Sequence, residues 1–232
     1  MKKSFYGCSW SGGKDSTLAL YRALKKGLRV RWLLTTLSQE FQRTSFHGVE
    51  KEIMLQQAKG LGMEILLKAI PRGMEEYEKE FKRAVNLLKR KGLGGMVFGD
   101  IDLEEHREWV ERVCGELEIE AVEPLWGEKQ ENLLREFVRE GFQAVVVSAK
   151  ADLLGEDWVG KRVDEKFIEE VEAFSWQGKL TPCGERGEYH TLCLGGPLFK
   201  ASLEIIQARP VLKNGYWFLD IQRWREVPLK EN

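Results

Sequence analysis

The residues best suited to chemistry stand near the start of the chain, in the run Ser11-Gly12-Gly13-Lys14-Asp15-Ser16. A short, mostly apolar segment precedes this run, and residues 17–24 after it are good helix formers, so the sequence predicts a strand, a glycine turn and a helix. The two glycines lack a Cβ and allow the backbone to approach a ligand closely. The N–H groups of the first helical turn, the hydroxyls and the Lys14 ammonium suit an anion, and phosphate is the usual one. The alternative is an ordinary glycine-rich turn with solvated charges.

A second polar stretch, Pro182-Cys183-Gly184-Glu185-Arg186-Gly187-Glu188-Tyr189-His190-Thr191, lies in the C-terminal half. Glu185 and Glu188 could bind an ammonium ion or a metal, and His190 could transfer a proton near neutral pH. Cys183 has no neighbour in the sequence that would activate its thiol, so we expect it to be structural. Taken alone, the stretch would equally suit a turn with solvated charges.

A third candidate is Gly99-Asp100, which follows a predicted strand. Asp100 could hold Mg²⁺ or polarise a nucleophile, or it could simply be a turn residue or helix cap. Asp102, with Glu105 three residues later, fits the cap better, which leaves Asp100 available for function. Arg107 in the following helix could meet a phosphate or a carboxylate, or it could form a surface ion pair.

The elements that must position these residues alternate between strand and helix in the first half of the chain. Apolar runs predict strands at 4–8, 30–37, 63–67 and 96–98, and helical spacing predicts helices at 17–24, 49–59, 74–88 and 102–117. Such alternation is typical of a parallel, doubly wound, Rossmann-like α/β sheet, whose ligands bind at the carboxyl ends of the strands. The glycine loop, Ser38 and Gly99-Asp100 all fall at such ends.

The second half is less regular and predicts a smaller α+β domain. We expect helices at 133–138 and 164–174, and strands at 142–148, 191–199, 203–208 and 217–221. The alternating pattern ends near Pro124–Gly127, so we divide the chain into a ligand-binding domain, 1–126, and a C-terminal domain, 127–232.

Composition limits the classes of function. The net charge is −1, which argues against a nucleic-acid partner because no overall basic surface is present. No apolar run reaches membrane-spanning length, and the N-terminus lacks the apolar core of a signal peptide, so we expect a soluble cytoplasmic protein with no membrane partner. The four cysteines include no Cys-x-x-Cys pair, which argues against a zinc site or a disulfide framework.

The three motifs occur in order with two others, Pro124-Leu125-Trp126 and Gly196-Pro197-Leu198-Phe199. The first resembles the pyrophosphate-binding loop (PP-loop) of the N-type ATP pyrophosphatases, and the whole set resembles the diphthine–ammonia ligase family over nearly the full chain. This resemblance implies an adenine nucleotide alpha hydrolase-like fold that cleaves ATP between its α- and β-phosphates. The family converts the carboxylate of diphthine, a modified histidine on elongation factor 2, to an amide with ammonia, and releases AMP and pyrophosphate.

The resemblance also implies residue roles. ATP would bind to residues of the loop and the strand ends: Ser11, Gly12, Gly13, Lys14, Asp15, Ser16, Ser38, Gly99, Asp100 and Arg107. Mg²⁺ would bridge the phosphates through Asp15 or Asp100. Lys14 and Asp100 would act in catalysis, and Glu185, Glu188 or His190 would handle ammonia. The implied partners are ATP, ammonia and a carboxylate acceptor, such as a modified translation factor. A second copy of the chain is a further candidate.

The chain departs from the family pattern in the second stretch, and two rival functions stay open. Arg186 stands where archaeal and eukaryotic members carry glycine, and His190 stands where they carry glutamate. This form resembles bacterial-type relatives, and bacteria do not make diphthamide, so the reaction type transfers better than the acceptor. One rival is a PP-loop enzyme that modifies tRNA. The other is a nucleotide-binding module without catalysis.

Overall fold

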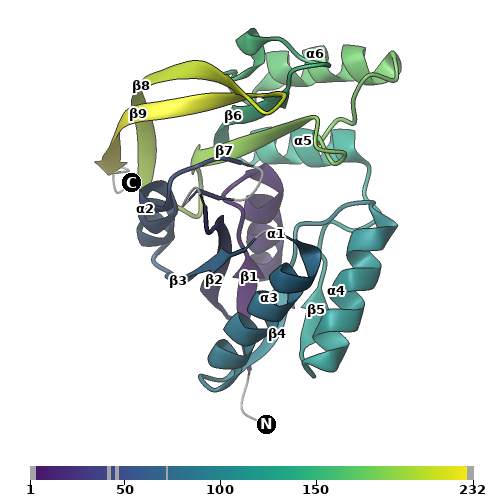
Figure 1. The fold of residues 1–232 in the computed structure, drawn as a ribbon, viewed down its shortest axis with the longest axis vertical. Helices are drawn as coiled ribbons and strands as arrows, with labels where there is room; N and C mark the ends of the chain where they lie inside the picture. Colours follow the sequence, from purple (N-terminus) through teal and green to yellow (C-terminus); the bar gives the residue numbers. More distant parts are fainter. Residues whose placement is uncertain (1–3, 41–42, 45–46, 72, 229–232) are drawn as a thin grey trace.

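Five parallel strands form the N-terminal sheet of the computed structural model, which describes residues 4–40, 43–44, 47–71 and 73–228 (Figure 1). The strands are β1 (Phe5–Ser9), β2 (Val30–Ser38), β3 (Glu64–Ile70), β4 (Leu93–Val97) and β5 (Glu120–Val122). Their order in the sheet is β3-β2-β1-β4-β5. The chain therefore reverses its direction of travel across the sheet between β1 and β4, where the loop after β1 and the Gly99-Asp100 turn meet.

Helices cover both faces of this sheet, which makes it doubly wound as predicted. The helices are α1 (Lys14–Lys25), α2 (Lys51–Leu61), α3 (Met74–Lys89) and α4 (Glu104–Glu116). Buried side chains of α1 and α2 pack with Leu33 of β2, whereas those of α3 and α4 pack with its neighbours Trp32 and Leu34. Successive residues of a strand point to opposite faces, so each strand supplies both layers.

A second, antiparallel sheet and two helices form the C-terminal half. Its elements are α5 (Gln130–Arg139), β6 (Gln143–Lys150), the short 3-10 helix η1 (Glu156–Trp158), α6 (Glu165–Trp176), β7 (Tyr189–Gly195), β8 (Ala201–Lys213) and β9 (Tyr216–Pro228). The strand order is β7-β6-β9-β8. Asn214 and Gly215, both at positive φ, form the tight turn between β8 and β9, as expected for a two-residue hairpin loop.

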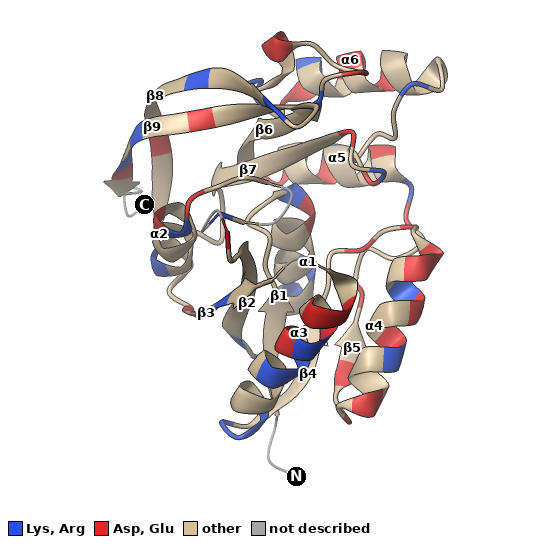
Figure 2. Ribbon diagram, viewed as in Figure 1, with Lys and Arg blue, Asp and Glu red and all other residues tan. Residues whose placement is uncertain are grey.

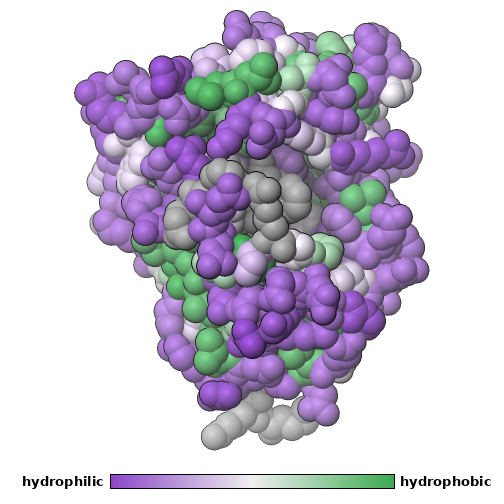
Figure 3. Space-filling view, in the orientation of Figure 1, coloured by the Kyte–Doolittle hydropathy of each residue, from purple (hydrophilic) through white to green (hydrophobic). Residues whose placement is uncertain are grey.

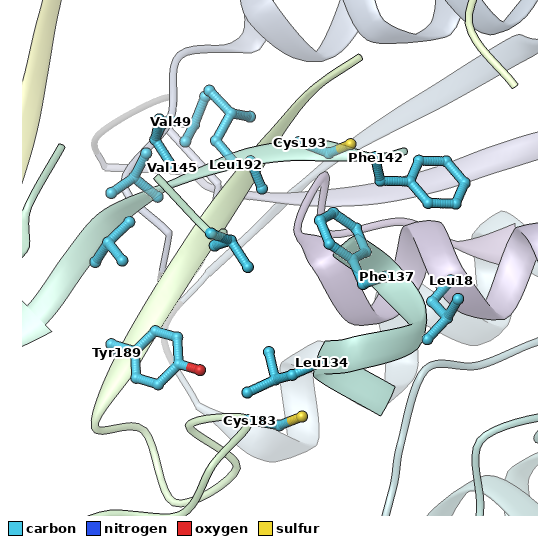
Figure 4. Packing of buried hydrophobic residues seen from close by; sticks show 14 of the residues in the cluster. Leu18, Val49, Leu134, Phe137, Phe142, Val145, Cys183, Tyr189, Leu192 and Cys193 are labelled. Carbon is cyan, nitrogen blue, oxygen red and sulfur yellow. The ribbon is translucent and has the colours of Figure 1, made fainter. Parts of the chain in front are cut away.

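One hydrophobic cluster joins the two halves. It includes Leu18 of α1 together with Leu134 and Phe137 of α5, Phe142, and Leu192 of β7 (Figure 4). Strand β7 lies at the sheet edge that faces α1, so it brings the C-terminal half against the glycine loop (Figure 1). The position of the site thus depends on this shared core.

Three local predictions need correction. Asp102 does not cap α4, because Leu103 occupies the cap position and the Asp102 carboxylate accepts a hydrogen bond from Gln130. The predicted strand 191–199 begins and ends earlier, because β7 runs from Tyr189 to Gly195 and so includes the end of the second polar stretch. The predicted strands 203–208 and 217–221 lie in the first parts of the longer strands β8 and β9, each of 13 residues.

The surface in view is mainly hydrophilic, with small separated apolar patches (Figure 3). Acidic and basic residues alternate along α3 and α4, where they form ion pairs between and within the helices (Figure 2). In the described part of the chain, no helix is both long and apolar enough to cross a membrane.

Candidate active site

The glycine loop connects β1 to α1 at the carboxyl edge of the parallel sheet. Gly12 has φ of +79°, a conformation that favours glycine, and Gly13 is the N-cap residue of α1. The Ser11 hydroxyl accepts a hydrogen bond from the Gly13 N–H and lies 3.1 Å from the Ser16 hydroxyl. The first turn of α1 is thus held in the geometry that suits an anion at a helix N-terminus.

Strand β7 of the other sheet packs directly on this loop. The Cys193 N–H donates to the Gly12 carbonyl (2.8 Å), and the Lys14 N–H donates to the Thr191 hydroxyl (3.0 Å). A Cβ on Gly13 would lie 2.9 Å from the Thr191 carbonyl oxygen, so only glycine allows this contact. The loop is therefore shaped by the C-terminal half as well as by its own sequence.

Gln57 of α2 joins the loop to β7, a role that no sequence pattern indicates. Its amide nitrogen donates to the carbonyls of Gly12 (3.0 Å) and Cys193 (2.6 Å), and its amide oxygen accepts from the indole of Trp10 (3.0 Å). All three bonds are buried. Gln57 thus fixes the approach of two segments that lie far apart in the sequence.

Lys14 is a buried cation at the start of α1. Its side chain is only 3% exposed; the ammonium pairs with the Asp15 carboxylate at 2.9 Å and donates to the Cys183 carbonyl. Burial alone would lower the pKa of Lys14, but the negative charge of Asp15 more than offsets this, so the lysine stays protonated. Lys14 therefore supplies a fixed positive charge and also ties α1 to the second polar stretch.

Three carboxyl groups gather beside Lys14, from three different elements. Asp15 starts α1, Asp100 follows β4, and Glu185 comes from the turn before β7. Burial and the nearby carboxylates Asp15 and Asp100 raise the pKa of Glu185 to about 8 against the effect of Lys14. Burial likewise raises the pKa of Asp15, although Lys14 opposes it. The raised pKa values follow from the crowding of these carboxyl groups, and a bound cation would favour their ionised forms.

The three histidines of the sequence all lie at this site. His106 of α4 bonds through Nδ1 to the Asp100 carboxylate (3.0 Å), and this bond raises the pKa of His106. The rings of His47 and His190 lie 4.8 Å apart, and burial lowers the pKa of both, that of His47 to about 4. Both imidazoles are therefore neutral at neutral pH.

His47 was missed by sequence reasoning, and its tautomer follows from one contact. Its Nδ1 lies 2.9 Å from the Thr191 carbonyl oxygen, which can only accept, so Nδ1 carries the proton. The Nε2 atom is therefore unprotonated, and the ring also borders Gly13. The rarity of histidine in the chain is the signal that could have identified His47.

Glu188 lies inside the turn rather than facing the three carboxyl groups. It is buried, and its carboxylate accepts hydrogen bonds from the Thr181 N–H (2.7 Å), the Thr181 hydroxyl (3.2 Å) and the Arg186 N–H (2.9 Å). These bonds close the turn that presents Glu185. The carboxylate of Glu188 thus has a structural use that the sequence did not reveal.

The remaining sequence candidates lie at the edges of the site. Gly99 packs against the start of α1, where a Cβ would come within 2.9 Å of the Ser16 nitrogen. Arg107 stacks over the Trp126 ring and bonds to Glu111 at 2.8 Å, which is the surface ion pair that the sequence left open. Ser38 ends β2 at the carboxyl edge and faces a separate pocket.

Glu123 is a further carboxyl group that sequence reasoning did not select. Burial and the charge of Asp100 raise its pKa to about 7, and its Oε1 atom is buried with no hydrogen-bond partner in the described structure. It follows β5, next to Asp100 and Arg107, so it extends the row of acids along the sheet edge.

The donor set fits a cation held jointly with a nucleotide better than a resident metal. Among the residues that the structure describes, no group of three or more histidine, cysteine, aspartate or glutamate side chains has metal-binding geometry. Carboxylate oxygens are the ligands that Mg²⁺ prefers, and it usually takes one or two of them together with substrate phosphates. Asp15 and Asp100, beside the glycine loop at the start of α1, fit that pattern.

Comparison with known proteins finds a family match for each half of the chain. The family model of the diphthamide synthase N-terminal domain matches residues 6–121, and that of the C-terminal domain matches residues 129–227. A human protein named diphthine–ammonia ligase is 29% identical over 156 residues, which span 67% of this chain and 58% of that protein. The rat protein of that name is 26% identical over 231 residues, which span 91% of this chain and 86% of that protein.

A structural comparison finds a protein described as a predicted subunit of tRNA methyltransferase from Methanocaldococcus jannaschii. It is 17% identical, with a TM-score of 0.44, and the match covers 82% of this chain and 97% of that one. A likeness of this size carries no argument about function. The two family models, in contrast, together span nearly all of the described residues in the expected order, and the chain belongs to the diphthamide synthase family.

Proposed function

We propose that this protein is an ATP-dependent ligase that forms a C–N bond: it adenylates a carboxylate and converts it to an amide with ammonia. The observation that carries the proposal is the meeting of a phosphate-binding turn with the carboxyl groups of Asp15, Asp100 and Glu185, drawn from both halves of the chain. A turn for phosphates beside crowded carboxyl groups suits a reaction of ATP with a cationic or ammonia-like partner. The names of the relatives support the same reaction.

In the first step, an oxygen of the acceptor carboxylate attacks the α-phosphorus of ATP, and pyrophosphate leaves. The start of α1, from Gly13 onward, holds the phosphates, and the fixed charge of Lys14 stabilises the negative charge that develops on the leaving group. Bound Mg²⁺ would neutralise phosphate charge, with Asp15 and Asp100 as its protein ligands. The product is an acyl-adenylate.

In the second step, ammonia attacks the acyl carbon, AMP leaves, and a proton must be removed from the nitrogen. Glu185 is the best placed of the three sequence candidates, because its carboxyl group faces Asp15 and Asp100 and has a pKa of about 8. At neutral pH this carboxyl group is mainly protonated, and a cation bound beside it would favour the ionised form, which can accept a proton from the nitrogen. The Nε2 atom of His47 offers a second acceptor on the other side of the loop.

The names of the relatives indicate which acceptor to test first. They are named for diphthine, so an elongation factor 2 that carries diphthine is the first acceptor to test. Arg186 and His190 depart from the pattern of archaeal and eukaryotic members. Small carboxylates should therefore be tested as alternative acceptors.

The test is a pyrophosphate-release assay with ammonium, run with the diphthine-bearing factor and with a panel of small carboxylates. We expect pyrophosphate and AMP to appear only when acceptor and ammonium are both present, and the acceptor to gain an amide by mass spectrometry. Release of ADP and orthophosphate would contradict the proposed cleavage between the α- and β-phosphates. Tight ATP binding with no turnover on any acceptor would favour a nucleotide-binding module instead.

A further inference from the structure

A pocket of about 470 Å³ lies between the C-terminal hairpin and the segment that follows β2. Ser38, Arg43, Thr44 and Gly48 form one wall, and the β8–β9 hairpin forms the other. The pocket is separate from the phosphate-binding turn, and none of its residues except Ser38 was selected from the sequence. Its size suits a small molecule or a single modified side chain.

The hairpin wall is a regular patch of three cross-strand pairs. Arg209 is opposite Asp220, Val211 is opposite Phe218, and Lys213 is opposite Tyr216. All six side chains line the pocket, because residues two apart on a strand, and residues directly opposite each other, share one face of the sheet. The patch therefore combines charge at its ends with an apolar and aromatic middle.

The charge of the pocket favours an anion. Among its described lining residues, three are basic, Arg43, Arg209 and Lys213, and one is acidic, Asp220. The Asp220 carboxylate is shared, since it lies 3.4 Å from the Arg43 guanidinium and 3.6 Å from that of Arg209. The Arg43 guanidinium also pairs with the Glu50 carboxylate at 2.9 Å. Arg209, whose side chain is 67% exposed, is therefore the arginine more available to a bound anion.

The pocket adjoins the site of ATP chemistry through His47 and Gly48. Gly48 has φ of +67° and packs on the Phe218 ring, which lies 2.7 Å from the position of a Cβ. The preceding residue, His47, borders Gly13 of the phosphate-binding turn and bonds to the Thr191 carbonyl. One side of this short segment thus faces the pocket and the other faces the turn.

The C-terminal sheet makes the same connection. One row of cross-strand partners crosses this sheet: Ser148 of β6 lies between Phe218 of β9 and His190 of β7. The row runs from Phe218, which lines the pocket, to the His190 imidazole, whose ring lies 4.8 Å from that of His47. Ser148 in its middle is fully buried, and its hydroxyl has no hydrogen-bond partner in the described structure.

We propose that this pocket binds the carboxylate acceptor, an anionic molecule or side chain with an apolar or planar part. This inference rests on the proposed function. The basic residues attract the acceptor while it is a carboxylate, and Val211, Tyr216 and Phe218 pack on its apolar part. The amide product is neutral, so the pocket binds it more weakly than the substrate, and this difference promotes product release.

The test uses benzoate and its neutral isostere benzamide as probes, and it requires no catalysis. Ligand-observed NMR should show benzoate binding to the full-length protein and weaker or no binding of benzamide. The variant Arg209→Gln should weaken benzoate binding by about tenfold or more, the loss expected for one charge-assisted contact. The matched control is Arg223→Gln, an exposed arginine of β9 outside the pocket, which should bind benzoate like the wild type.

Measurements of ATP binding show whether the pocket binds the acceptor or the nucleotide. We expect ATP affinity to be unchanged in Arg209→Gln, and benzoate to bind in the presence of saturating ATP. Competition between benzoate and ATP would overturn the proposal, as would equal binding of benzoate and benzamide, equal behaviour of the two arginine variants, or no benzoate binding at all. The proposed ligase function fails on a different result, the absence of acceptor-dependent pyrophosphate release from the wild-type protein.

Discussion

At the scale of single residues, Lys14 combines a functional charge with a structural role. Its ammonium bonds to Asp15 and to the Cys183 carbonyl inside the molecule. Lys14→Met should abolish pyrophosphate release and also lower the free energy of unfolding by about 1–3 kcal/mol, because buried acceptors lose their donor. Denaturant unfolding and ATP titration measure the two effects. Lys26→Met, an exposed lysine at the end of the same helix, is the control and should change neither.

The raised pKa of Glu185 predicts how the stability of the protein depends on pH. Its pKa in the folded protein is about 8, above its ordinary value of 4.5, so the folded state binds its proton more tightly than the unfolded state. Its contribution to stability is therefore present below about pH 4.5 and is lost as the pH rises toward 8. Melting temperatures across this range should fall less steeply in Glu185→Gln than in the wild type. Parallel curves for the two proteins would mean that Glu185 is not buried among like charges.

The Nε2 atom of His47 is the basis of a prediction about catalysis. His47→Asn can keep a donor near the Thr191 carbonyl but removes the Nε2 lone pair. If Nε2 accepts a proton from ammonia, amide formation should fall by roughly 10²–10⁴. Exchange of pyrophosphate into ATP, measured with acceptor and without ammonia, should persist. Equal loss of both activities would place His47 in adenylation or in the packing of the loop.

At the scale of elements, the turn before β7 depends on Glu188. Its carboxylate accepts from Thr181 and Arg186, and these bonds hold Glu185 toward the loop. Glu188→Gln turns one acceptor into a donor, so we expect lower stability and an equal loss of adenylation and amidation. Measuring pyrophosphate exchange and amide formation side by side tests this. A selective loss of amidation would instead return Glu188 to the ammonia-handling role suggested by the sequence.

The sequence predicted the elements better than the contacts between them. Strand and helix patterns are local, and they predicted the doubly wound sheet, the glycine turn between β1 and α1, and the strand that became β6. The contacts that shape the site join residues far apart: Gln57 meets Cys193 across 136 residues, and His47 meets Thr191 across 144. Such pairs depend on how two sheets pack together. No periodicity of a single segment contains that information, so Gln57 and His47 were missed and Glu188 was given the wrong surroundings.

At the scale of the whole molecule, the two halves share their largest hydrophobic cluster. Leu18 and Ala19 of α1 belong to it with Phe137 of α5 and Val146 of β6, and β7 adds hydrogen bonds to the glycine loop. Two domains with separate cores could unfold one after the other, but a shared core couples them. We therefore expect one cooperative unfolding transition for the full chain.

Phe137→Ala tests this coupling, because Phe137 is buried in the C-terminal half at the boundary with α1. Loss of a buried phenylalanine should cost about 3–5 kcal/mol of unfolding free energy. Hydrogen exchange should then show weaker protection for the amides of α1 and β1 as well as for those of β6, since all of them open in the same global event. ATP affinity should fall together with stability, although Phe137 lies in none of the elements that form the phosphate-binding turn. Protection lost only in the C-terminal sheet would show two independent units, and the ATP site would then owe its shape to the N-terminal half alone.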